Sequence, residues 1–252
     1  MENNVAVIVN TNSNYEDLWP IFYSELIKYW PNHPKLYTFS DRPNDCVYLG
    51  YISLMTGTTL LYNKDQCFRD QYLSCIKQVP EKYVITFNED YVLYNFVDFD
   101  KLKEYINILD TTDYSFIRLT STSENHVDKY MSGLYHIPFY SNNLYSQTVS
   151  IWKTRTLEKI HEKGPQLHIG SRGEKEGSFE FNANQTCMSL GIEGLVHWNK
   201  EPKRGIAHYD NNIVPYIASA LIKGKWNLSE YSKELTPLIK KYNIDTSIRG
   251  IY

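Results

Sequence analysis

Short apolar runs alternate with segments of helical periodicity through the first half of the chain. Leu18, Phe22, Leu26 and Tyr29 recur at helical spacing, and similar patterns cover residues 68–79 and 98–109. The apolar runs have the length and side chains of strands covered on both faces: VAVIVN (5–10), KLYTFSD (35–41), YVITFN (83–88) and YSFIRLT (114–120). Strands and helices in this alternation predict an α/β fold with a mostly parallel central sheet flanked by helices.

The second half is less regular. Residues 121–146 are typical of loops or short strands, QTVSIWK (147–153) alternates like a half-buried strand, and 169–178 has the glycine and charge content of a mobile loop. Further elements are predicted as follows: helices at 156–163, 179–191 and 214–227, the last closing near Gly224, and a strand at 193–198. Since no repeat or low-complexity linker interrupts the chain, we expect a single domain over residues 1–252.

Composition narrows the classes of partner. The 26 basic and 29 acidic residues give a net charge of −3, and no basic block suggests that nucleic acid is the main partner. The cysteines form no CxxC pair and no zinc-like cluster with histidine, which fits a reducing compartment. The opening MENNVAVIVN lacks the features of a signal peptide, and no apolar run is long enough for a transmembrane segment. We therefore expect a cytoplasmic protein for which peripheral contact with a membrane stays open.

Polar side chains gather where the predicted parallel strands end. These positions are Asn10, Thr11 and Asn12 after the first strand, Ser40 and Asp41 after the second, and Asn88, Glu89 and Asp90 after the third. In open α/β sheets, ligands bind beyond the carboxyl ends of the strands. The pattern favours a nucleotide-type site at this edge, although ordinary loop polarity would produce the same residues.

The adjacent carboxylates of Glu89 and Asp90 need partners, because a carboxylate is costly to desolvate alone. One alternative is a structural pairing with a nearby arginine or with backbone N–H groups. The other is a hard cation such as Mg²⁺ or Mn²⁺, which prefers oxygen ligands and also binds substrate phosphates.

Two long segments carry a family resemblance: YEDLWPIFYSELIKYWPNHPKLYTFSD and EKYVITFNEDYVLYNFVDFDKL. Together with the later VSIWKTRTLEKI, FE and GKWN, they resemble a group of bacterial glycosyltransferases of the GT-A fold, which have a first helix ending near YWP and a strand ending in a DDY or EDY motif. The resemblance implies a nucleotide-sugar-binding half at residues 1–120 and an acceptor-binding half at 121–252. It also implies a metal cofactor, Mn²⁺ or Mg²⁺.

The resemblance assigns roles to matching residues. Asp90 would bind the metal or the diphosphate, and Glu89 would contact a ribose, a sugar or the groups behind the metal. Asn88 departs from the family, which has an acid at the first position, and this puts strict metal dependence in doubt. Glu180 would be the catalytic base, and His208 a late metal ligand that suits Mn²⁺. Their plain alternatives are a helix N-terminal charge for Glu180 and a structural hydrogen bond for His208.

The donor pocket is expected to take its other residues from the strand ends. Asn10, Thr11, Asn12 and Asp41 would hydrogen-bond the base and the ribose. Arg69 would pair with a phosphate, its alternative being a salt bridge to a neighbouring aspartate, and basic side chains in SRGEKEG (171–177) would cover the diphosphate.

Aromatic residues make up 15% of the chain, and sugar rings present apolar faces to such side chains. Tyr135, Trp152 and Trp198 are candidate platforms for an acceptor glycan, with Gln147 as a hydrogen-bonding neighbour. Core packing explains most of the aromatic residues equally well.

Taken together, these observations predict a glycosyltransferase that moves a sugar from a nucleoside diphosphate sugar to a hydroxyl of a glycan, a lipid-linked sugar or another surface-polymer precursor, with inversion at the anomeric carbon. A nucleotidyltransferase is the enzymatic alternative, although NTNSNYEDLW after the first strand is no glycine-rich phosphate loop. A catalytically silent binder of sugar nucleotides or glycans is the alternative from another class.

Overall fold

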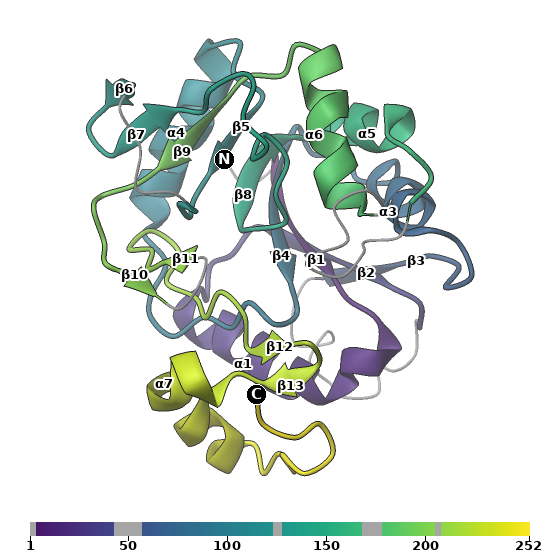
Figure 1. The fold of residues 1–252 in the computed structure, drawn as a ribbon, viewed down its shortest axis with the longest axis vertical. Coiled ribbons are helices and arrows are strands. Elements are labelled where there is room, and N and C mark those ends of the chain that lie inside the picture. The colour runs from purple at the N-terminus through teal and green to yellow at the C-terminus, as the bar shows by residue number, and fades with distance from the viewer. Residues whose placement is uncertain (1–3, 43–56, 123–127, 168–177, 205–207) are drawn as a thin grey trace.

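A mixed nine-stranded sheet forms the centre of the molecule (Figure 1). The computed structural model describes residues 4–42, 57–122, 128–167, 178–204 and 208–252, with the backbone alone at His208. The order across the sheet is β3-β2-β1-β4-β8-β5-β9-β7-β6. Its strands are β1 (Val5–Asn10), β2 (Lys35–Ser40), β3 (Gly57–Leu61), β4 (Tyr83–Asn88), β5 (Phe116–Arg118), β6 (Lys129–Met131), β7 (Leu134–His136), β8 (Ser150–Lys153) and β9 (Gly194–His197).

Most of these strands run in one direction. β3, β2, β1 and β4 are parallel neighbours, and β8 is inserted antiparallel between β4 and β5. β9 is parallel to β5, while β7 is antiparallel to both β9 and β6. Following these pairings, only β8 and β7 oppose the other strands of the described sheet, so the predicted α/β class with a mostly parallel sheet is confirmed.

Helices cover both faces of the sheet (Figure 1). They are η1 (Ser13–Leu18), α1 (Trp19–Tyr29), α3 (Phe68–Ile76), α4 (Phe99–Thr111), α5 (Thr154–Lys163), α6 (Phe179–Ser189) and α7 (Leu228–Lys241). The apolar residues of α1, α4 and α7 form one core with one face of the sheet. Those of α3, α5 and α6 form a second core on the opposite face. β1 serves both cores because its side chains alternate: Val7 and Val9 belong to the first and Ile8 to the second.

The strand register brings the predicted polar ends together. Asn10, the last residue of β1, lies opposite Phe39 of β2 and opposite Asn88, the last residue of β4. The backbone N–H of Thr11 continues this pairing to the carbonyl of Phe39 at 3.0 Å. The residues that follow β1, β2 and β4 therefore emerge side by side at one edge of the sheet.

Residues 214–227 are not the predicted helix, which is a correction to the sequence interpretation. They include a short hairpin of β12 (Leu221–Ile222) and β13 (Lys225–Trp226). Lys223 and Gly224 form its turn with φ values of 51° and 75°, a left-handed conformation that suits a two-residue hairpin turn and not a helix. The C-terminal helix is instead α7, whose first turn is capped by the side chain of Asn227.

Two other regions complete the comparison with the sequence. The run that forms β3 was not predicted as a strand, and the short strands β6 and β7 fall within the segment expected to hold loops or short strands. A second small hairpin pairs β10 (Lys203–Arg204) with β11 (His208–Tyr209). The loop predicted at 169–178 lies outside the described residues except for Ser178. No helix in the described ranges is long and apolar enough to cross a membrane.

Candidate functional site

The carboxyl end of β4 carries the Asn-Glu-Asp motif. A turn follows the strand, closed by a hydrogen bond from the Tyr91 N–H to the Asn88 carbonyl at 3.1 Å. The Asn88 side chain donates to Oε1 of Gln147 at 3.4 Å. The carbonyl of Asp90 accepts from the N–H of Ala220 at 3.1 Å, so the turn is also held by the segment that precedes β12.

Glu89 points into the protein, with only 6% of its surface exposed. Burial raises the pKa of its carboxyl well above the usual value, and the negative charge of Asp90 raises it further. A hydrogen bond involving Thr11 and the positive charge of Arg249 offset part of this effect. The buried carboxyl therefore binds a proton more tightly in the folded protein than in the unfolded chain.

This raised pKa makes stability depend on pH. Glu89 stabilises the fold most below its unfolded pKa, about 4.3, and that contribution is lost as the pH rises through the folded pKa. We expect Glu89→Gln to raise the free energy of unfolding by about 1 to 2 kcal/mol at pH 8, because the amide carries no charge to bury. Urea melts from pH 4.5 to pH 8.5 should show the gain shrinking toward low pH.

Glu104→Gln removes a negative charge from the exposed surface of α4 and is the control for this experiment. Its effect should not grow with pH in the same way. A gain for Glu89→Gln that is equal at both ends of the pH range would contradict the proposed cost of ionising the buried carboxyl.

The segment after β1 is tightly held. Nε1 of Trp19 donates to the Thr11 hydroxyl at 2.7 Å, and the Tyr62 hydroxyl donates to the Thr11 carbonyl at 2.6 Å. Asp41, from the end of β2, accepts hydrogen bonds from both the N–H and the hydroxyl of Ser13, each at 2.7 Å. Asp41 thus joins the first two strand ends, as the predicted convergence requires.

Asn12 has a structural role in this segment. Its side chain accepts from the N–H of Asn14 at 3.0 Å and caps η1. Thr11 is almost fully buried, with 1% of its surface exposed. These two residues shape the donor-side loop, while Asn10 is the member of the predicted trio that lines a pocket.

The sequence interpretation missed two residues beside the acidic motif. Burial raises the pKa of Tyr15, and the charges of Glu89 and Asp90 raise it further, which places this phenol near both carboxylates. Arg249, from the C-terminal segment, pairs with Asp17 and lies 5.1 Å from the centre of the Tyr15 ring. Nothing local in the sequence links position 249 to the first helical turn, so only the tertiary structure could identify it.

Glu180 lies in the first turn of α6 and reaches the same edge of the sheet. Its Oε1 accepts from the backbone N–H of Gln147 at 3.0 Å. Burial raises the pKa of the Tyr91 phenol, and the charges of Asp90, Tyr216 and Glu180 add to that effect. Tyr91 therefore lies within electrostatic range of both Asp90 and Glu180, although ninety positions of the chain separate these two carboxylates.

Arg118 is a buried charge at the end of β5 that the sequence interpretation overlooked. Only 3% of its surface is exposed, and burial lowers its pKa to about 10 although the charge of Glu180 favours the protonated form. Its guanidinium donates to the carbonyl of Asn143, while Nε has no hydrogen-bond partner in the described structure. An arginine inside the apolar run YSFIRLT was the available signal.

Several predicted residues are not brought to this edge. Arg69 forms an ion pair with Asp70 at 2.6 Å and donates to the carbonyl of Gly164, so the alternative of a salt bridge is the observed one. Tyr135 lies on β7, four strands from β4 in the sheet, and its ring packs against Trp198, which follows β9.

Two further predictions have different outcomes. Trp152 is 1% exposed and stacks on Phe116 at a ring distance of 4.2 Å, so its faces are committed to the core. The structure therefore does not support the prediction that Trp152 is an exposed platform for an acceptor glycan. His208 begins β11, and its side chain lies outside the described residues, as do Arg172 and Lys175.

A metal ion would find an incomplete set of ligands here. Within the described ranges, no three His, Cys, Asp or Glu side chains are grouped so that they could hold a metal. Glu89 is a poor ligand in this geometry, because its buried carboxyl has a raised pKa. Asp90 is partly exposed and remains suitable for a cation of the Mg²⁺ type, which commonly uses one or two carboxylates and completes its shell with substrate phosphates and water.

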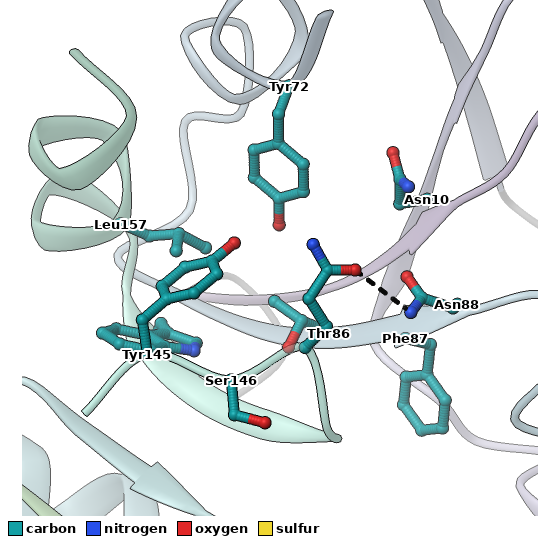
Figure 2. A pocket seen from close by; sticks show the side chains of 10 residues that line it. Asn10, Tyr72, Thr86, Phe87, Asn88, Tyr145, Ser146 and Leu157 are labelled. Atoms are coloured by element: carbon teal, nitrogen blue, oxygen red, sulfur yellow. Dashed lines mark hydrogen bonds between the residues drawn. The ribbon is translucent and has the colours of Figure 1, made fainter. Parts of the chain in front are cut away.

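A pocket opens between the ends of β1 and β4 and the helices α3 and α5. It is lined mainly by uncharged side chains from β1, α3, β4 and the segment before β8, including Asn10, Tyr72, Asn88, Tyr145 and Gln147. Its cavity volume is about 20 Å³, which is room for roughly one water-sized group, and its mouth is open to solvent. Figure 2 shows the Tyr72 and Tyr145 side chains directed toward its centre, with Asn10 and Asn88 on the opposite side.

Comparison with known proteins gives a likeness of fold. No family model and no curated protein matches this chain. Among solved structures, residues 1–349 of TarS from S. aureus align with 82% of the chain, at 13% identity and a TM-score of 0.51, and the same fragment in complex with UDP aligns over the same share at 14% identity and a TM-score of 0.53. The alignment covers 60% of each TarS fragment, so this chain spans less than two thirds of their length.

A weaker likeness, at a TM-score of 0.48 and 11% identity, is to a CMP:2-keto-3-deoxy-manno-octonic acid synthetase complexed with CTP, covering 77% of this chain and 88% of that one. At such low identities, the two likenesses to TarS establish a common α/β architecture and no more.

Proposed function

We propose that this protein transfers a sugar from a nucleoside diphosphate sugar to an acceptor hydroxyl, as a glycosyltransferase. The observation that carries the proposal is that Gln147 links the Asn-Glu-Asp turn to Glu180 at the carboxyl edge of the sheet, accepting from Asn88 and donating its N–H to Glu180. Transfer by direct displacement needs one group for the departing diphosphate and a second group for the attacking hydroxyl. Two carboxylates on separate elements meet that need.

The comparison with TarS supports the nucleotide part of the proposal. That protein has been crystallised with UDP, and its fragment aligns with most of this chain. In α/β sheets of this kind the ligand binds at the edge where β1, β2 and β4 end, which is where Thr11, Asp41 and Asp90 gather. A cytoplasmic location belongs to the same proposal.

Glu180 is the proposed general base. The hydrogen bond from the Gln147 N–H fixes Oε1 and leaves Oε2 without a hydrogen bond in the described structure. Oε2 would accept the proton of the acceptor hydroxyl while the acceptor oxygen bonds to the anomeric carbon. The bond from that carbon to the diphosphate breaks, and its electron pair leaves with the diphosphate, which inverts the anomeric centre.

Asp90 is the proposed residue on the diphosphate side. A bound Mn²⁺ or Mg²⁺ would supply positive charge for the leaving diphosphate. Asp90 would hold that ion, and Asn88, the departure from the family pattern, would orient Gln147 through their hydrogen bond. Glu89 would keep the turn in place from the buried side, through its hydrogen bond with Thr11.

The direct test measures binding and product together. UDP, GDP, CMP, dTDP and their sugar esters are added with Mn²⁺ or with EDTA, and thermal unfolding is followed. One nucleotide at about 100 times its Kd should raise the free energy of unfolding by about 2.7 kcal/mol, and EDTA should reduce the gain. Release of the same nucleoside diphosphate from its sugar ester should accompany binding.

Two outcomes would redirect the assignment. Release of pyrophosphate from a nucleoside triphosphate and a sugar phosphate would identify a nucleotidyltransferase. Binding of a sugar nucleotide without release of the nucleoside diphosphate, with any acceptor tested, would indicate a silent binding protein. If no nucleotide changes the unfolding temperature under any metal condition, the proposal is wrong.

A further inference from the structure

The uncharged pocket beside the acidic motif has a defined pattern of hydrogen-bonding groups. Tyr72 is 6% exposed, its ring packs against Phe39 and Phe68, and its hydroxyl has no hydrogen-bond partner in the described structure. In Figure 2 this hydroxyl points into the pocket. The Tyr72 hydroxyl is therefore available to bond a ligand that enters the pocket.

Tyr145 supplies the complementary group. His161 lies behind it, and burial lowers the His161 pKa to about 4, so the ring is neutral near pH 7. Its Nδ1 faces the Leu157 carbonyl at 2.9 Å and must carry the proton, because a carbonyl only accepts. Nε2 therefore accepts from the Tyr145 hydroxyl at 3.3 Å. The Tyr145 oxygen keeps its lone pairs for a donor in the pocket.

Gln147 adds a third group. Its Oε1 accepts from Asn88, while its Nε2 is buried and makes no hydrogen bond of normal length in the described structure. This Nε2 faces the Tyr145 oxygen, where it offsets part of the rise that burial causes in the Tyr145 pKa. A buried donor without a close partner is costly, so a ligand oxygen placed between the two groups would complete the hydrogen bonding. The pocket thus offers donors from Tyr72 and Gln147 and an acceptor from Tyr145. Its described lining contains no charged side chain. A ligand hydroxyl fits this volume and can both accept and donate here. A carboxylate can only accept, and it would lose its water without gaining a positive partner.

The position of the pocket identifies which part of the substrate would reach it. Asn88 lies beside the proposed diphosphate ligand Asp90, and the N–H of Gln147 holds the proposed base Glu180. In a direct displacement, the leaving group and the attacking hydroxyl lie on opposite sides of the anomeric carbon. The transferred sugar must therefore sit between Asp90 and Glu180, with its ring substituents next to the pocket.

We infer that the pocket formed by Tyr72, Tyr145 and Gln147 binds an uncharged hydroxyl substituent of the transferred sugar, and so selects neutral sugars over uronic acids. This inference rests on the proposed function and names the donor class of the same site. It also moves Gln147 from the acceptor side, where the sequence placed it, to the donor sugar.

The test compares a free nucleotide with its sugar esters by titration calorimetry. The nucleoside diphosphate that stabilises the wild-type protein is used with its neutral hexose ester and its uronic acid ester. We expect the neutral ester to bind at least about fivefold more tightly than the free nucleotide, and the uronic acid ester to bind no more tightly than it. Tyr72→Phe should weaken the neutral ester about fivefold and leave the free nucleotide unchanged.

Tyr105→Phe is the matched control, because it removes a buried phenol that bonds His197 on the other face of the sheet. It should leave all three affinities unchanged. The inference is overturned if Tyr72→Phe weakens the free nucleotide as much as the ester, or if it weakens neither. Tyr145→Phe is a second test variant, and it should also reduce the preference for the neutral ester over the uronic acid ester. Failure of the wild-type protein to bind any nucleotide would overturn the proposed function and this inference together.

Discussion

Replacing Glu180 with glutamine is expected to lower the rate of nucleoside diphosphate release by about a thousandfold, within the range that general bases contribute. The amide oxygen can still accept from the Gln147 N–H, so the position of the side chain is kept while its basicity is lost. Release is measured from the sugar nucleotide that stabilises the wild-type protein. The affinity for the free nucleotide should stay the same, because the base acts on the acceptor side.

Two variants make this result interpretable. Glu162→Gln removes an exposed carboxylate near the end of α5 and should leave the rate unchanged. Glu180→Asp keeps a base but shortens it and should retain more activity than the glutamine variant. If correctly folded Glu180→Gln keeps the wild-type rate, Glu180 is not the general base. That result would not contradict the proposed nucleotide site.

Replacing Asp90 with asparagine is expected to reduce the metal-dependent part of nucleotide affinity by at least about a hundredfold, since even residues behind metal ligands contribute that much. Binding that persists in EDTA should change little. Calorimetric titration with and without Mn²⁺ separates the two parts. An asparagine variant with the full response to Mn²⁺ would be incompatible with Asp90 as the residue that holds the cation.

Unfolding cannot account for that loss. The charge of Asp90 raises the pKa of the buried Glu89 carboxyl, so its removal lowers the cost of ionising Glu89 at neutral pH. Asp90→Asn should therefore be at least as stable as the wild-type protein above pH 7. Asp100→Asn, at a position whose side chain is 93% exposed on α4, controls for the loss of one negative charge.

Local patterns were sufficient for most of the elements that build the sheet. VAVIVN and YVITFN form β1 and β4 at the predicted positions, because continuous apolar runs of this length can only be buried on both sides. The convergence of Asn10, Asp41 and Asn88 also followed from sequence, since parallel neighbours place their carboxyl ends at one edge.

Misreadings arose where turn chemistry outweighed apolar content. Residues 214–227 are rich in apolar side chains, yet Lys223 and Gly224 adopt positive φ and turn the chain into a hairpin. Asn227 and Glu230 begin α7 three residues apart, as in a helix cap, and this signal was present in NLSE. Cap and turn residues were the better guide in this region.

By itself, the sequence determined an α/β sheet and a set of polar strand ends, because secondary structure and strand direction follow from periodicity over a few residues. The tertiary structure decided which candidates meet. It joined Glu180 to Gln147 and Arg249 to Asp17, and it enclosed Tyr72 and Tyr145 around one pocket. Such contacts depend on how helices pack across the whole sheet, and spacing along the chain carries no record of that packing.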